Sequence, residues 1–204
     1  MEPIFTIIVL IFSVILHELA HGYAALRLGD PTARLAGRLT LNPLKHLDWF
    51  GSVFLPGLLL LTGGFIFGWA KPVPYNPYNL RVGRFGPAAV AAAGPATNLL
   101  IAFVFAVLLR SNFLTASPEL ARGADLVALI ILLNLMLAIF NLLPIPPLDG
   151  SKILAAFLPL RLEAAFEQWA ARYQWLIIVV ALLILLNSNW LSRLTLAVFR
   201  LLVG

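Results

Sequence analysis

The sequence predicts an all-α protein that crosses the membrane several times, because apolar residues dominate the chain and gather in long segments. Hydrophobic residues make up 61% of the 204 residues and charged residues only 11%, whereas soluble domains are nearer half apolar and a quarter charged. The mean hydropathy is +0.96. Four apolar segments, 4–26, 87–109, 124–143 and 174–196, reach the roughly 20 residues that a transmembrane helix needs. We therefore expect about four transmembrane helices, in contact with the lipid bilayer, in one domain over residues 1–204.

The first segment, 4–26, is expected to remain in the protein as a transmembrane helix. Its only early charge is Glu2, whereas a secretory signal peptide begins with a positively charged region. Arg27 and the sequence Gly29-Asp30-Pro31 follow the segment. Glycine and proline interrupt helices, so we expect the first helix to end there.

The stretch 33–75 is expected to form a re-entrant region with short β elements. Residues 33–42 alternate between apolar and polar types, which is typical of a short strand or hairpin. Residues 49–68 are apolar but interrupted by two Pro/Gly or Gly/Gly pairs, so they form either a span or a re-entrant hairpin. Residues 69–75 carry prolines at alternate positions, which favours an edge strand or extended segment over a helix.

The charged residues exclude several classes of protein. The formal net charge is +5, but no run of basic residues and no basic helix face is present, so we expect no nucleic-acid partner. The chain has no cysteine, which excludes disulfides, thiolate ligands and a cysteine nucleophile. Residues 160–173 mix arginine and glutamate with large apolar side chains, which predicts a helix at the membrane interface.

The sequence His17-Glu18-Leu19-Ala20-His21 has the H-E-x-x-H spacing of a metal site. Residues i and i+4 lie above one another on a helix, so His17 and His21 can bind one zinc ion. Glu18 is then close enough to take a proton from a water on that ion, which makes it the candidate general base. An incidental pair of core histidines is disfavoured, because each ionisable group in an apolar span costs on the order of 2–3 kcal/mol.

A catalytic zinc site needs a third protein ligand and one open position. Without cysteine, the candidates are His46 and Asp149. Asp149 is favoured because it follows the apolar segment 124–143 in an apolar context, with helix capping as its alternative role. We place His46 in a loop or in support of the site, because a fourth protein ligand would close the open position.

Three sequence elements resemble the site-2 proteases, a family of intramembrane zinc metalloproteases. The first is His17-Glu18-Leu19-Ala20-His21-Gly22, the second is Gly94-Pro95-Ala96-Thr97-Asn98, and the third is the N-x-x-P-x-x-P-L-D-G pattern between Asn141 and Gly150. They occur in the order found in the family. The chain shows no PDZ-like or CBS-like insertion, so it resembles the minimal type that consists of the core alone.

The resemblance implies one Zn2+ ion bound by His17, His21 and Asp149, with Glu18 as the general base. It further implies that Asn141 and, less directly, Asn98 hold the substrate backbone or stabilise the oxyanion. Hydrogen bonding between helices is the alternative role of both asparagines.

The shared ion constrains the topology. His21 and Asp149 meet only if an even number of crossings separates them, and segments 87–109 and 124–143 supply two. We therefore expect 49–68 to enter the membrane and return on the same side. Ten of the fourteen Lys and Arg residues then lie on the metal side, and four lie on the other side, namely Arg110, Arg122, Arg193 and Arg200. The positive-inside rule places the metal site toward the cytoplasm and the N-terminus outside, in what we expect to be a prokaryotic plasma membrane.

The expected substrate is a transmembrane protein or peptide, which must unwind before its peptide bonds become accessible. Strand edges at 34–41 and 69–75 would bind such a segment by β-augmentation, so Lys71, Pro72 and Val73 are candidate substrate-binding residues. Packing at the membrane interface is the alternative role of this segment.

Two other functions compete with proteolysis. A metal-ion transporter needs ionisable residues on several spans, but the later apolar segments carry no His or Glu, and their one acidic residue, Asp125, lies near an end. A catalytically silent zinc-binding scaffold is the second, and the intact Glu18 argues against it.

Overall fold

The computed structural model describes residues 2–48, 71–111, 118–186 and 189–204, and within these ranges every regular element is a helix. Three helices contain a stretch that is long and apolar enough to cross a bilayer, α1 (Glu2–Arg27), α4 (Gly86–Arg110) and α5 (Pro118–Asn141). The chain continues into α6 (Asp149–Phe157), α7 (Leu160–Leu186) and α8 (Trp190–Val203). The shorter elements are α2 (Thr32–Leu35) and the 3-10 helices η1 (Pro43–Lys45), η3 (Pro77–Asn79) and η4 (Gly83–Phe85).

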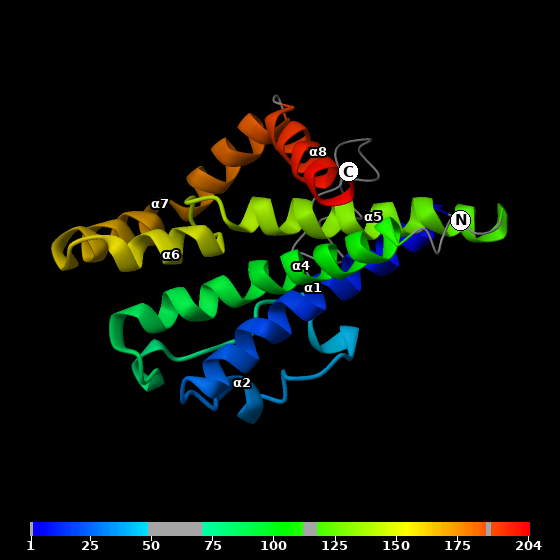
Figure 1. Ribbon diagram of the computed structural model, residues 1–204. Helices are drawn as coiled ribbons and strands as arrows, with labels where there is room; N and C mark the ends of the chain where they lie inside the picture. Colours follow the sequence, from blue (N-terminus) through cyan, green and yellow to red (C-terminus); the bar gives the residue numbers. More distant parts are fainter. Residues whose placement is uncertain (1, 49–70, 112–117, 187–188) are drawn as a thin grey trace.

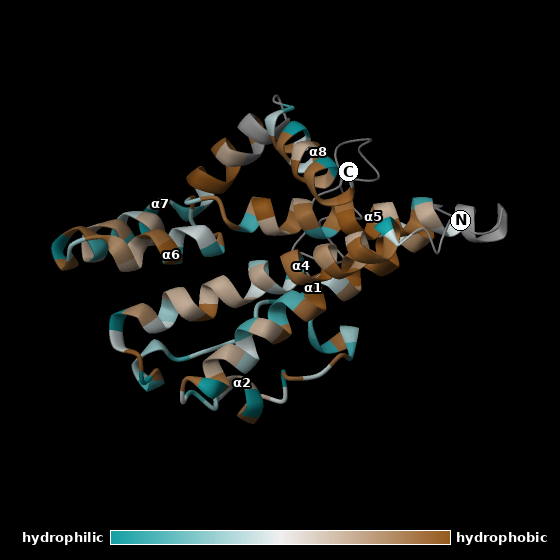
Figure 2. Cartoon of the chain, viewed as in Figure 1, coloured by the Kyte–Doolittle hydropathy of each residue, from teal (hydrophilic) through white to brown (hydrophobic). Residues whose placement is uncertain are grey.

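Helices α1, α4 and α5 hold the candidate membrane spans of the described residues. Among the described residues, three stretches are long and apolar enough to cross a bilayer, Ile4–Arg27, Gly83–Arg110 and Gly123–Asn141. Hydrophobic colour covers most of α1, α4 and α5 in Figure 2, and hydrophilic residues gather in the connecting segments. The predicted spans 4–26, 87–109 and 124–143 are therefore confirmed to within a few residues at most ends, and the chain is an integral membrane protein.

Helix α4 lies at the centre of the bundle and packs against α1, α5, α6 and α8. It runs opposite to α1 and α5, so the ends of α1 and α5 that carry higher residue numbers lie toward the same end of the bundle (Figure 1). Small side chains on α4 allow these close approaches, because they let helix backbones come together. The small residues buried on α4 are Gly86, Ala88, Ala91, Gly94, Ala102 and Ala106.

The predicted fourth span, 174–196, is not one helix. The boundary expected at 173/174 is present as a kink, because Tyr173 has non-helical angles (φ −110°, ψ 15°) within α7. However, α7 ends at Leu186 and a separate helix, α8, begins at Trp190 and packs back on α5 (Figure 1). The sequence Asn187-Ser188-Asn189 consists of residue types that favour turns, and the hydropathy of the whole segment concealed this boundary.

The strand predicted at 33–42 is also wrong, since residues 32–35 form α2 and no described residue lies in a strand. The chain reverses at Gly37, whose positive φ of 64° suits glycine. Arg38 then turns inward, and its Nη2 donates hydrogen bonds to the carbonyls of Lys71 (2.7 Å) and Pro72 (3.3 Å). The alternating pattern reflected these individual contacts and not a sheet. The predicted re-entrant hairpin at 49–68 lies outside the described residues.

The segment that follows residue 70 packs against the end of α1. Residues 71–76 have no helical or strand assignment, so the helix that their prolines disfavour is absent here, and so is an edge strand. A Cβ added to Gly22 would lie 2.9 Å from Cγ1 of Val73 and 2.5 Å from Cδ2 of Leu39, so this glycine allows the close packing. Asp30 is fully buried nearby and accepts hydrogen bonds from the Asn76 amide (2.7 Å) and the Asn79 side chain (2.9 Å).

Candidate metal centre

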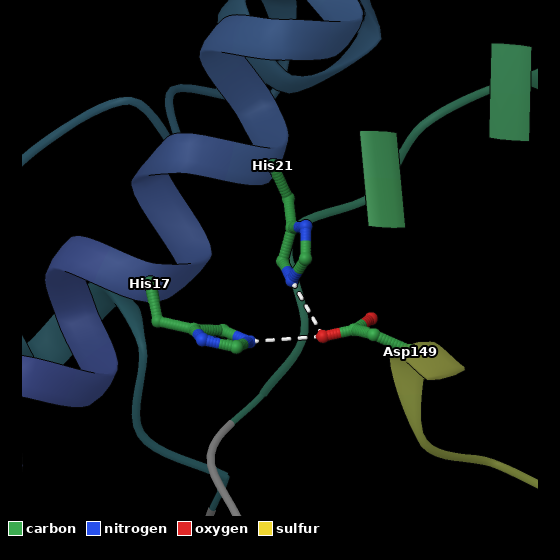
Figure 3. A group of neighbouring side chains, drawn as sticks. All are labelled: His17, His21 and Asp149. Carbon is green, nitrogen blue, oxygen red and sulfur yellow. Dashed lines mark hydrogen bonds and ion pairs between the residues drawn. The ribbon is translucent and has the colours of Figure 1, made fainter. Parts of the chain in front are cut away.

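Two helices bring the predicted metal ligands together (Figure 3). His17 and His21 lie one turn apart on α1, with ring centroids 4.6 Å apart. Asp149 is the first residue of α6, and its Oδ2 lies 3.1 Å from Nε2 of His17 and 3.2 Å from Nε2 of His21. All three side chains are buried, and one ligand atom from each lies within 4.8 Å of the others. The first motif, which carries His17 and His21, and the third motif, which carries Asp149, therefore meet at one point.

The second ring nitrogen of each histidine is hydrogen-bonded to an oxygen on α4. Nδ1 of His17 donates to Oδ1 of Asn98 (2.6 Å), and Nδ1 of His21 donates to the carbonyl of Val90 (2.7 Å). Because both partners are oxygens, each proton is held on Nδ1 and the lone pair of Nε2 points toward Asp149. Such outer hydrogen bonds are typical of histidines that bind metals.

Helix α4 leaves room for the metal centre at Gly94. A Cβ added at this position would lie 2.5 Å from Nε2 of both His17 and His21. A second glycine, Gly150, allows α6 to begin against the end of α5, because a Cβ there would overlap the carbonyl of Leu142. Each of these two motif glycines therefore has a steric reason to be glycine.

The charge of Asp149 matches a metal ligand. Its Oδ2 faces the Nε2 lone pairs of His17 and His21 at 3.1 and 3.2 Å, and three acceptor atoms that converge in this way suit a cation. Lys152, one turn later on α6, lies 4.0 Å from Oδ1, the carboxylate oxygen that does not face the histidines. Oδ2 is therefore the carboxylate atom placed to act as a ligand.

The donor set fits zinc. Two imidazole nitrogens and one carboxylate oxygen are a known ligand set of catalytic zinc, in which a fourth position stays open for water or substrate. The spacing of the ligand atoms, the hydrogen bonds that orient both rings, and the space at Gly94 agree with a single bound ion. His17, His21 and Asp149 are the residues that would hold it.

Glu18 faces the segment 71–76, which has no helix or strand assignment. Its Oε2 accepts a hydrogen bond from the backbone amide of Val73 (2.8 Å), and its side chain lines the same cavity as the histidines. The carbonyls of the two preceding residues are bound by Arg38. The segment that contains Lys71, Pro72 and Val73 is therefore fixed beside the candidate general base.

A cavity of about 620 Å³ opens onto the metal ligands. Its walls come from α1, α4, the end of α5, the start of α6, the segment 72–75 and the second half of α7, and most of the lining residues are apolar. On the side away from α6 it extends from Val14 of α1 to Trp175, Ile178 and Ala181 of α7. The metal centre is thus accessible from a largely apolar space between helices.

The remaining predicted residues fall into three positions. Asn141 lines the cavity, and its Nδ2 donates to the carbonyl of Leu137 (2.9 Å). Asn98 is fully buried and contacts His17 and Asn134, so its contacts are those of interhelical hydrogen bonding, the alternative that the sequence had left open. His46 lies outside the ligand group in a loop, where its Nε2 donates to the carbonyl of Thr40 (2.8 Å).

Sequence reasoning missed two buried polar residues behind the metal centre, Ser13 and Asn134. Asn134 is 0% exposed and Ser13 is 4% exposed, and they are hydrogen-bonded to each other (3.0 Å). The available signal was a polar side chain in the middle of an apolar span, which is costly unless it has a partner.

Comparisons with known proteins agree with this centre. The chain matches the family model of peptidase family M50 over residues 5–122 and 119–186. It is 40% identical over 188 residues to YwhC of Bacillus subtilis, provisionally named a zinc metalloprotease, which covers 90% of this chain and 82% of the relative. It is 33% identical to Rip2 of Mycolicibacterium smegmatis, which has the same provisional name, over 90% of this chain and 68% of the relative.

A third relative, from Methanocaldococcus jannaschii, is named zinc metalloprotease MJ0392, and it is 30% identical over 74% of this chain and 33% of its own length. No solved structure matches the chain. The family match covers the part of the chain that carries His17, Glu18, His21 and Asp149. The chain belongs to peptidase family M50, the site-2 protease family, and is a zinc metalloprotease embedded in the membrane.

Proposed function

We propose that this protein is an intramembrane endopeptidase that hydrolyses peptide bonds in or near transmembrane segments of other membrane proteins. The observation that carries the proposal is the position of the ligands within a membrane-spanning helix. His21 lies six residues before the end of α1 at Arg27, which is about 9 Å at 1.5 Å per residue. A protease with its metal at this depth acts on a segment that enters the membrane region.

The substrate segment is proposed to occupy the apolar cavity between α1 and α7, at the level of Val14 and Trp175. An apolar wall suits the side chains of a transmembrane segment. The segment 71–75 lies in the same cavity and offers backbone groups for pairing with an unwound substrate. Among the described residues, the carbonyl of Val73 and the amide of Tyr75 have no hydrogen-bond partner, so both are proposed to bind the substrate backbone.

The proposed chemistry is hydrolysis with general-base catalysis. Zinc bound by His17, His21 and Asp149 supplies a Lewis acid for a carbonyl oxygen and lowers the pKa of water. Because the Val73 amide holds Oε2 of Glu18, Oε1 is the atom proposed to take the proton from water and deliver it to the leaving amine. Asn141, which lines the cavity, is proposed to donate a hydrogen bond to the oxyanion.

The protein is proposed to lie in a prokaryotic plasma membrane, with its N-terminus outside and its metal centre toward the cytoplasm. The basic residues support this orientation. Arg27, Arg34, Arg38 and Lys45 follow the metal-binding end of α1, whereas Arg110 lies at the opposite end of α4. Cytoplasmic loops carry an excess of Lys and Arg.

The absence of native cysteine makes the orientation directly testable. Single cysteines at Asn79 and Ser111 would be labelled with a membrane-impermeant maleimide in oriented vesicles. Both positions are exposed, and they lie at opposite ends of α4. Labelling of Ser111→Cys from outside and of Asn79→Cys from the cytoplasmic side supports the orientation, and the reverse pattern refutes it.

The central experiment compares the wild type with Glu18→Gln on single-span substrates in liposomes, and measures zinc in both proteins. We expect cleavage by the wild type alone and one zinc per chain in both, because Glu18 is not among the ligands. Asp125→Asn, which changes an exposed carboxylate on α5, is the matched control and is expected to cleave normally. Cleavage that persists in Glu18→Gln at the wild-type rate would contradict the role given to Glu18. Bound zinc without cleavage of any span by the wild type would contradict the proposed substrate class.

A further inference from the structure

A chain of buried hydrogen bonds connects the zinc ligand His17 to the middle of α5. Asn98 of α4 lies between them, with its Oδ1 2.6 Å from Nδ1 of His17 and its Nδ2 2.9 Å from Oδ1 of Asn134. Nδ2 of Asn134 then donates to Oγ of Ser13 (3.0 Å) and to the carbonyl of Ile130 (2.9 Å). Asn98 and Asn134 are both 0% exposed, so water does not compete for these groups.

The carbonyl of Ile130 fixes which groups donate and which accept along this series of hydrogen bonds. The carbonyl of Ile130 can only accept, so the amide group of Asn134 must present Nδ2 to it and Oδ1 to Asn98. An oxygen at that position can only accept from Asn98, which turns Nδ2 of Asn98 toward it and leaves Oδ1 facing His17. The carbonyl of Ser13 also accepts from Nδ2 of Asn98, at the longer distance of 3.4 Å.

The consequence lies in the tautomer of His17. With Oδ1 of Asn98 opposite Nδ1, the ring proton sits on Nδ1 and the lone pair of Nε2 faces Asp149 and the metal. If the Asn98 amide were reversed, its NH2 would face Nδ1, and the ring proton would move to Nε2, the nitrogen that must bind zinc. The reversed amide therefore competes with metal binding.

We propose that Asn134 is a positioning residue for zinc: through Asn98 it selects the His17 tautomer whose Nε2 can bind the metal. His21 needs no such device, because its Nδ1 donates directly to a backbone carbonyl, that of Val90. Asn134 thus helps to keep the ring proton of His17 on Nδ1, as a main-chain carbonyl does for His21. This role concerns metal binding and is independent of any substrate.

A purely structural role for Asn134, as a hydrogen bond that joins α4 and α5, predicts a different result. It predicts lower stability without a change in the histidine tautomer or in the intrinsic zinc affinity. Two measurements therefore separate the roles: the zinc dissociation constant by competition with a chelator, and the 15N chemical shifts of the histidine rings in zinc-free protein. The chain has only three histidines, and His46→Gln assigns the third ring.

The test variant is Asn134→Leu, and the matched control is its neighbour Leu135→Ala. Leu135 is equally buried, in the apolar cluster with Ala102 and Ile131, and its aliphatic side chain has no group that can join the hydrogen bonds. We expect Asn134→Leu to weaken zinc binding about tenfold, the lower end of the effect of losing a group that orients a metal ligand. We also expect mixed tautomers for His17 in this variant. Leu135→Ala should lower thermal stability and keep the zinc affinity and the Nδ1-protonated ring. Asn134→Ser, whose side chain is one bond shorter and does not reach Asn98, makes the same test if the leucine variant does not fold.

The double variant Asn98→Asp/Asn134→Leu provides a second test. A carboxylate has only acceptor oxygens and orients His17 by itself, so Asn134→Leu should have no effect on zinc affinity when Asp occupies position 98. An unchanged zinc affinity in Asn134→Leu and Asn134→Ser overturns the proposal. Equal losses in Asn134→Leu and Leu135→Ala, or a loss that persists undiminished with Asn98→Asp, overturn it as well.

Discussion

Replacing Gly94 with alanine should remove zinc while leaving the helix intact. The new Cβ would lie 2.5 Å from Nε2 of both His17 and His21, about 0.9 Å closer than the 3.4 Å at which ordinary contact begins. The rings or α4 must move by roughly that distance, whereas distances in metal sites tolerate about 0.2 Å. We therefore expect zinc affinity to fall at least as far as when an orienting group is lost, roughly 10- to 100-fold.

The same substitution should not destabilise the helix itself. Alanine is favoured over glycine inside a helix by about 1 kcal/mol, which offsets part of the roughly 1–3 kcal/mol that overpacking the buried rings costs, so the zinc-free variant is expected to fold with a stability within about 2 kcal/mol of the zinc-free wild type. The assay combines zinc content, chelator competition and thermal unfolding of both forms. Gly86→Ala is the control on the same helix, because the three atoms nearest to its Cβ would all belong to the Leu80 side chain, the first at 2.8 Å, and not to a metal ligand. It should bind zinc normally. Wild-type zinc affinity in Gly94→Ala would refute the steric argument and with it the position assigned to the ion.

Three further predictions concern the segments around the metal centre. Burial raises the pKa of Asp30, but its hydrogen bonds outweigh this and lower the pKa from 3.8, so the carboxylate stabilises the fold above that pH and less as the pH falls below it. Asp30→Asn should thus cost about 1–3 kcal/mol near neutral pH, a difference that shrinks below about pH 4; a pH-independent difference in denaturant titrations would contradict this. Arg38→Ala frees the carbonyls of Lys71 and Pro72, and should raise KM for a transmembrane substrate while zinc content stays at one per chain. Loss of zinc in this variant would show that Arg38 acts on the metal centre instead. His46→Gln should also retain one zinc per chain, measured by metal analysis, and a stoichiometry that falls to zero would show that His46 is a ligand.

The metal ligands could be predicted because their positions depend on local geometry and on one topological condition. His17 and His21 are one helical turn apart in any helix, and an even number of crossings brings Asp149 to the same end of the bundle. The groups that orient these ligands could not be predicted in the same way. Asn98 is 81 residues from His17 in the chain, and which face of α4 it occupies depends on how α1, α4 and α5 pack. Its motif therefore predicted that the residue matters, and the structure was needed to show what it touches.

The errors in the predicted fold arose where tertiary contacts outweigh local pattern. The alternation at 33–42 indicated a strand, but Ala33 is buried in the short helix α2, and Arg38 turns inward to bind backbone carbonyls. Hydropathy over 174–196 indicated one span, because a mean over the segment does not register a helix that ends at Leu186 and another that starts at Trp190. The three spans around the metal centre were predicted because their apolar runs are long enough to cross a bilayer.

Helix α4 contributes no metal ligand, yet it touches both ligand histidines through three of its positions. Gly94 sets the space beside the rings, and Val90 and Asn98 hold their outer nitrogens. A substitution at one of these positions would change how tightly the metal is held without altering any residue that reacts. Proteins with identical motifs at the ligands themselves, on α1 and α6, can thus differ in how much zinc their surroundings must contain before they become active. Adaptation to metal-poor habitats would then appear as substitutions on one face of α4. A comparison restricted to the motifs of α1 and α6 would miss them.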